Sequence, residues 1–281
     1  MALAVTRERR RRAGRRAGPR RPVSREPEWF LRFSVSQRLQ HAVLAVSFVA
    51  LVITGIPQKY PDWPLATWTI DQLGGIDNSR LIHRSFAVAF VALAVYHMLE
   101  IGLSAMRGRL RPTMVPNLKD VLDALAMLRY SVGLTPAPPK FGRYEYRQKF
   151  EYWGIIFGSA IMISTGLVLW LPIVFTKLLP GEVVAAAREA HGGEATLAML
   201  TIVTWHLYSV LISPAAFPGD YSIFTGRISR ERIMEEHPLE YSSQRRQAEA
   251  EGAEAGVRDA RAERARQFRQ RRLGQGRSGN Q

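Results

Sequence analysis

The chain alternates four long hydrophobic segments with segments rich in polar and charged residues. The hydrophobic segments cover residues 39–56, 82–103, 152–174 and 191–212. The shortest of them corresponds to about 27 Å of α-helix, which is enough to cross a thin hydrocarbon core. The pattern therefore predicts an all-α fold: a multi-pass integral membrane protein whose four spans form a helix bundle.

Basic residues are concentrated in the segments that would lie on one side of this membrane. Residues 1–38 contain twelve arginines, and the connection 107–149 carries nine basic residues. The loops 57–80 and 175–190 are close to neutral. The positive-inside rule therefore places both termini in the cytoplasm. We expect a basic disordered tail over residues 1–38, a four-helix transmembrane domain over 39–212, and a cytoplasmic polar segment with a charged tail over 213–281.

Composition narrows the kinds of cofactor and partner that the chain can bind. The formal net charge is +15, but the arginines stand where anionic membrane lipid would attract them, so we expect lipid rather than nucleic acid as their partner. There is no cysteine. This excludes an iron–sulfur cluster, a covalently attached c-type haem, a disulfide and a thiolate zinc site within the chain.

Histidines occur in pairs along the hydrophobic segments. His191 and His206 are fifteen residues apart, and His83 and His97 are fourteen apart. Both steps are close to four helical turns. The two histidines of each pair can therefore both face the bundle interior, about 22 Å apart along the helix axis. His41 lies in the first segment. An imidazole in the bilayer core is costly unless it has a partner.

Paired histidines on facing helices indicate two b haems. Ligation by two imidazoles fills both axial positions of the iron and suits electron transfer. The alternative is a non-haem membrane anchor or a proton-coupled transporter subunit with histidines as proton relays. That alternative would favour acidic residues within the spans, where the sequence has only Glu100 and Glu194, near the helix ends.

An internal repeat relates the two halves of the bundle. The segment ITGIP at residues 53–57 recurs as STGLVLWLP at residues 164–172, and the histidine pairs recur at nearly the same offset. The repeat and the depth in the membrane favour pairing of His97 with His206 for the inner haem. Arg84, beside His83, is a candidate partner for a haem propionate.

Three segments carry a resemblance to a known family. They are RQKFEYWGIIFGSAIMISTGLVLWLP, the span from His191 to WHLY, and TGRISRERIMEEHP. With them, residues 30–240 resemble the cytochrome b (gamma) subunit of membrane-bound formate dehydrogenases. The wider group includes the cytochrome b subunits of nickel–iron hydrogenases and thiosulfate reductase.

The resemblance implies a di-haem subunit of the bacterial inner membrane that passes electrons between a periplasmic partner and menaquinone or ubiquinone. The partner would be an iron–sulfur or multihaem cytochrome subunit, joined to a catalytic oxidoreductase subunit.

By position, the resemblance places the outer haem between His83 and His191 and the inner haem between His41 and His206. We favour His41 over the alternative ligand His97. Glu145 stands where relatives have an amide, near the expected quinone, and is a candidate proton acceptor.

Overall fold

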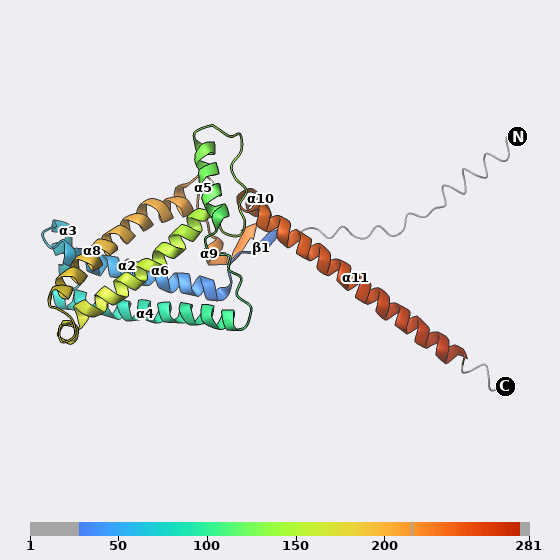
Figure 1. Ribbon diagram of the computed structural model, residues 1–281, viewed down its shortest axis with the longest axis horizontal. Helices are drawn as coiled ribbons and strands as arrows, with labels where there is room; N and C mark the ends of the chain where they lie inside the picture. The colour runs from blue at the N-terminus through green and yellow to red at the C-terminus, as the bar shows by residue number, and fades with distance from the viewer. Residues whose placement is uncertain (1–27, 215, 276–281) are drawn as a thin grey trace.

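Four long apolar helices dominate the computed structural model, which describes residues 28–214 and 216–275, with side chains up to residue 264. All four are long and apolar enough to cross a membrane, which confirms the predicted all-α architecture for the described part of the chain. The helices are α2 (Val35–Lys59), α4 (Ile76–Met106), α6 (Tyr146–Trp170) and α8 (Glu182–Thr201), the last continued by the π-helical turns η1 (Ile202–His206) and η2 (Tyr208–Ile212). Figure 1 shows α2 beside α4, with α6 and α8 inclined to this pair.

The four helices form two hairpins that contact each other. Helix α2 packs against α4, and α6 packs against α8. Helix α2 also contacts α8, which joins the two hairpins. Helices related by the internal repeat therefore occupy corresponding places in the bundle, and the histidines of different hairpins can face one another.

The helices differ from the predicted spans mainly at their ends. Helix α2 begins four residues before its predicted hydrophobic segment. The other three helices begin six to nine residues before theirs. Polar capping accounts for two of these starts: Ser34 forms a capping box with Gln37, and Glu145 forms one with Gln148. Helix α6 ends at Trp170 rather than at residue 174, because Pro172 begins the separate short helix α7 (Pro172–Phe175).

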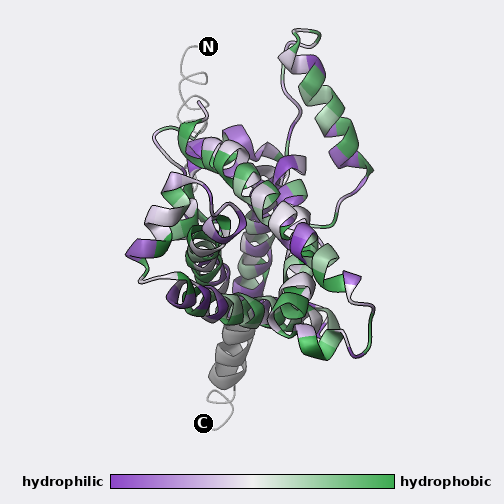
Figure 2. Cartoon of the chain, turned by 90° about the vertical axis from the view of Figure 1, so that its left-hand side faces the viewer, coloured by the Kyte–Doolittle hydropathy of each residue, from purple (hydrophilic) through white to green (hydrophobic). Residues whose placement is uncertain are grey.

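Short helices connect the spans. Helix α3 (Pro64–Gln72) lies in the loop predicted for residues 57–80. Helix α5 (Leu118–Ser131) stands apart from the bundle, with hydrophobic and hydrophilic residues around its axis (Figures 1 and 2). Lys149 ties α5 to α6 through a 2.8 Å ion pair with Asp120. Helix α5 lies within the basic connection 107–149.

A small polar cap closes the end of the bundle opposite α3. It consists of β1 (Trp29–Leu31), β2 (Arg227–Ser229), α9 (Ser222–Thr225), α10 (Arg230–Glu236) and the start of α11 (Pro238–Gln275). The two strands pair antiparallel, and α11 extends away from the bundle (Figure 1).

The structure of the polar cap differs from what was expected for the two terminal segments, residues 1–38 and 213–281. Residues 29–31 belong to a strand and α2 begins at Val35, so the disorder predicted up to residue 38 is wrong for this part. Residues 1–27 lie outside the described residues. The predicted charged tail is helical in α11 as far as Gln275.

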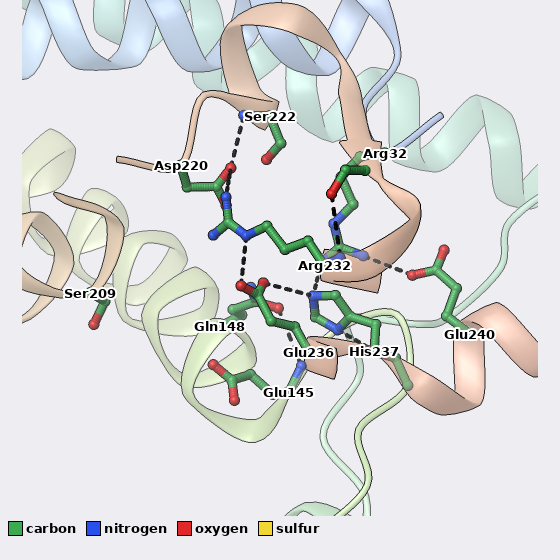
Figure 3. Close-up of polar contacts among 12 residues, drawn as sticks. Arg32, Glu145, Gln148, Ser209, Asp220, Ser222, Arg232, Glu236, His237 and Glu240 are labelled. Atoms are coloured by element: carbon green, nitrogen blue, oxygen red, sulfur yellow. Dashed lines mark hydrogen bonds and ion pairs between the residues drawn. The ribbon is translucent and has the colours of Figure 1, made fainter. Parts of the chain in front are cut away.

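A buried charge network holds the polar cap together (Figure 3). The side chain of Arg32 is 3% exposed and donates to Glu240 at 2.8 Å. Arg143, from the loop before α6, donates to the other carboxylate oxygen of Glu240 at 2.7 Å. His237 lies 3.1 Å from Arg32 and donates through Nδ1 to the carbonyl of Gly142 at 2.8 Å. The network joins the segment before α2 and the start of α11 to the loop before α6.

We expect the polar cap to lose stability between pH 6.5 and pH 4. Burial, together with the positive charge of Arg32, lowers the pKa of His237 to about 4. In this range the unfolded chain binds a proton at residue 237 that the folded chain does not bind, so the free energy of unfolding falls as the pH falls. The loss is about 3 kcal/mol, because each pKa unit corresponds to about 1.36 kcal/mol.

Thermal unfolding of the detergent-solubilised protein at pH 7.5, 6 and 5 measures this loss. The variant His237→Asn is the matched comparison, since it has no imidazole to titrate. The expectation fails if the unfolding temperatures of the two proteins fall equally with pH.

Candidate functional site

Two pairs of histidines face each other at different levels of the bundle. His83 on α4 faces His191 on α8, with ring centroids 6.4 Å apart. His41 on α2 faces His206 on η1, with ring centroids 6.3 Å apart. All four side chains are half-buried. The first pair lies toward the α3 end of the bundle and the second toward the polar cap.

The spacing of both pairs fits two axial ligands of one metal ion. An imidazole nitrogen binds a transition metal at about 2.0 Å and lies roughly 1.1 Å from its ring centre, so two opposed ligands have centres about 6.2 Å apart. Within the described residues, no group of three or more His, Asp or Glu side chains could hold a metal ion. The pairs therefore suit a metal whose remaining ligands come from a cofactor, as iron in haem has.

Two threonines determine which ring nitrogen carries the proton in His83 and His191. The Thr54 hydroxyl donates to the carbonyl of Ala50 at 2.7 Å and lies 2.9 Å from Nδ1 of His83. Its one proton is used, so it accepts from Nδ1–H and leaves Nε2 of His83 free for a metal. Thr165 repeats this arrangement, 3.0 Å from Nδ1 of His191 and donating to Ile161 at 2.6 Å.

The glycine after each threonine gives the imidazole room. A Cβ atom on Gly55 would lie 3.0 Å from Cε1 of His83, and one on Gly166 would lie 3.2 Å from Cε1 of His191. The repeated Thr-Gly dipeptide thus supplies a hydrogen-bond acceptor and clearance for one histidine of the following helix. The sequence showed the repeat, but these roles need the three-dimensional contacts.

A carboxylate takes the place of the threonine in the second pair. Nδ1 of His206 lies 3.1 Å from Oε2 of Glu151 on α6. Because a carboxylate accepts hydrogen bonds, Nδ1 carries the proton and Nε2 is free. Sequence reasoning did not identify Glu151, whose only signal was a charged residue near the start of an apolar span.

His97 lies in a separate hydrogen-bond network. Its Nδ1 is 2.7 Å from Oε1 of Gln40, and its Nε2 is 3.0 Å from the hydroxyl of Tyr152. The amide nitrogen of Gln40 donates to Glu100 at 2.6 Å, which fixes Oε1 as the acceptor from His97. Both ring nitrogens of His97 are therefore occupied by protein groups. The structure brings His41, rather than His97, against His206.

The two charged candidates lie at opposite ends of the bundle. The Arg84 guanidinium is 5.5 Å from the centre of the Trp170 ring, near the first histidine pair. Glu145 caps α6 and accepts from Nε and Nη2 of Arg147 at 3.0 and 2.9 Å. Lys59, which sequence reasoning missed, packs over Gly192, where an added Cβ would lie 3.0 Å from Nζ.

Comparisons with known proteins identify a family and several relatives of this chain. The model of the family described as prokaryotic cytochrome b561 matches residues 32–217. The nitrate-inducible formate dehydrogenase cytochrome b556(Fdn) subunit of Escherichia coli K12 is 23% identical over 206 residues, covering 73% of this chain and 86% of that protein. The formate dehydrogenase cytochrome b556 subunit of Haemophilus influenzae is 21% identical over 218 residues, covering 76% and 83%.

Proposed function

Because the chain belongs to the prokaryotic cytochrome b561 family, we propose that it is the di-haem cytochrome b subunit of a formate dehydrogenase-like complex. As a member of this family it is a multi-pass membrane protein of electron transport. Its similarity to formate dehydrogenase cytochrome b556 subunits over about three quarters of the chain supports the type of complex.

The two imidazole pairs carry the proposal. His83 and His191 would hold one haem b, and His41 and His206 the other. Haem held by these residues would supply one-electron transfer. The matched spacings of 6.4 and 6.3 Å support one iron per pair. Arg84 and Lys59 are suited to pair with propionates of the haem near His191.

The charge distribution supports the direction in which the bundle crosses the membrane. The polar cap and the basic connection with α5 lie at the same end of the bundle (Figure 1). By the positive-inside rule this end is cytoplasmic, so both termini lie in the cytoplasm. The pair His83–His191 then lies on the periplasmic side, where an iron–sulfur or multihaem cytochrome subunit would exchange electrons. A quinone, menaquinone or ubiquinone, would react near His206, with Glu145 in the adjoining segment.

Haem stoichiometry and quinol oxidation test the proposal. A pyridine haemochrome assay on the purified full chain is expected to give about two b haems per protein. Addition of a menaquinol analogue is expected to reduce part of the haem in membranes. Protein without haem, made in cells that load other b cytochromes, would contradict the proposal and favour a non-haem membrane anchor or a proton-coupled transporter subunit.

Replacement of Gly55 by valine is expected to lower the haem content from about two to about one per chain. The first atom of the new side chain would already lie 3.0 Å from Cε1 of His83, and the imidazole cannot move without losing its bond to Thr54. Gly102→Val in α4 is the matched control, because a Cβ there meets nothing within 4 Å. Pyridine haemochrome assays of the two variants give the comparison, and equal haem contents would argue against the close fit.

A further inference from the structure

The hydrogen-bond acceptors of the paired histidines differ in charge. His83 and His191 each donate to a neutral hydroxyl, from Thr54 and Thr165. His206 donates to a carboxylate, that of Glu151. Among residues 28–214 and 216–264, the His41 ring makes no hydrogen bond. Both levels of the bundle therefore have a pair of facing histidines, but the groups that accept hydrogen bonds from these histidines differ in charge.

The Glu151 carboxylate is held against His206 rather than spread over other partners. Its side chain is 21% exposed and that of His206 is 28% exposed. Arg147, one helical turn earlier on α6, binds both oxygens of Glu145 instead. Within the described residues, His206 is the hydrogen-bond partner of Glu151, and the Arg147 guanidinium also interacts with this carboxylate electrostatically.

The helix geometry at His206 supports a functional role for its contact with Glu151. His206 ends the π-helical turn η1, and π-helical turns inside α-helices occur frequently at functional sites. The wider turn changes the direction in which later side chains leave the helix. It coincides with the placement of the His206 ring between His41 and Glu151.

We propose that Glu151 is a positioning residue that lowers the reduction potential of the haem held by His41 and His206; this rests on the proposed function. A carboxylate that accepts from the distal nitrogen makes the imidazole a more basic ligand. A more basic ligand stabilises the ferric over the ferrous state. In a water-poor bundle the effect is stronger than at a surface. Neutral threonine acceptors do not shift the other haem in this way.

Redox titrations of Glu151→Gln and Glu151→Leu in the purified full chain test the proposal. Glutamine keeps an acceptor oxygen but removes the charge. The equilibrium constant for reduction of the His41–His206 haem is expected to rise about tenfold in both variants, a shift of about 59 mV for one electron. The redox transition of this haem is identified as the one that remains in His191→Ala, because that variant lacks a proposed ligand of the other haem. Glu189→Gln, an exposed carboxylate on α8, controls for loss of a negative charge elsewhere.

The outcomes separate this inference from the proposed function. Two haems with an unshifted potential in Glu151→Gln would overturn the role of Glu151 and leave the di-haem proposal intact. A shift in Glu151→Leu alone would also overturn it, because orientation without charge would then explain the effect. Absence of haem from the parent protein would overturn the proposed function itself.

Discussion

Replacing His41 by alanine is expected to lower the haem content from about two to about one haem b per chain. His41 lies opposite His206, with ring centroids 6.3 Å apart, so its loss would remove one of the two imidazoles proposed to hold this haem. A haem bound by one imidazole in an apolar bundle loses its low-spin spectrum and is retained weakly. The pyridine haemochrome assay gives the stoichiometry, and the reduced-minus-oxidised spectrum shows which absorbance is lost.

The variant His97→Ala is the matched comparison, because it removes another imidazole from the same end of the bundle. Both nitrogens of His97 are bound, to Gln40 and Tyr152, so about two haems per chain are expected to remain. The reverse result, with haem lost in His97→Ala and kept in His41→Ala, would establish the pairing that follows the sequence repeat.

Replacing Glu240 by alanine is expected to destabilise the polar cap by about 3–5 kcal/mol, the usual cost of removing one partner from a buried ion pair. Glu240 accepts from Arg32 and Arg143, and its side chain is 7% exposed. Burial lowers the pKa of Arg32, and the charge of Glu240 opposes this shift. Without Glu240, two guanidinium groups would lie close together with no carboxylate between them. Thermal unfolding and limited proteolysis measure the loss.

Glu249→Ala is the control for this change. Glu249 pairs with Arg245 on the same helix, but the side chains are 63% and 57% exposed. Exposed pairs of this kind contribute at most about 1 kcal/mol. Equal effects of the two substitutions would show that burial of the cap network is not what stabilises it. Haem content is expected to stay unchanged in Glu249→Ala and to fall in Glu240→Ala only on warming.

Several parts of this chain were readable from local composition. A run of about 20 apolar residues forms a membrane-spanning helix in almost any tertiary context, because the backbone must bond internally. The four spans and the histidines within them were therefore predicted. The helix starts at Val35 and Tyr146 were missed because the polar residues that cap and begin these helices lie outside the hydrophobic runs.

The small sheet formed by β1 and β2 could not be predicted from the local sequence. Each strand has three residues, too few to establish an alternating pattern. Trp29 pairs with Ser229, so the partners lie 200 residues apart in the sequence. The buried contact between Arg32 and Glu240 depends on this pairing, and neither residue stands out among many arginines and glutamates.

The sequence by itself determined the membrane architecture, the absence of cysteine ligands and the set of five histidines from which haem ligands can come. Hydropathy and residue identity act over one helix at a time, so no folded contact is needed for these conclusions. The tertiary structure alone decided that His41 faces His206 while His97 is held by Gln40 and Tyr152. That choice depends on how neighbouring helices rotate against each other, and a rotation of one residue, about 100°, turns an imidazole from the bundle interior toward lipid.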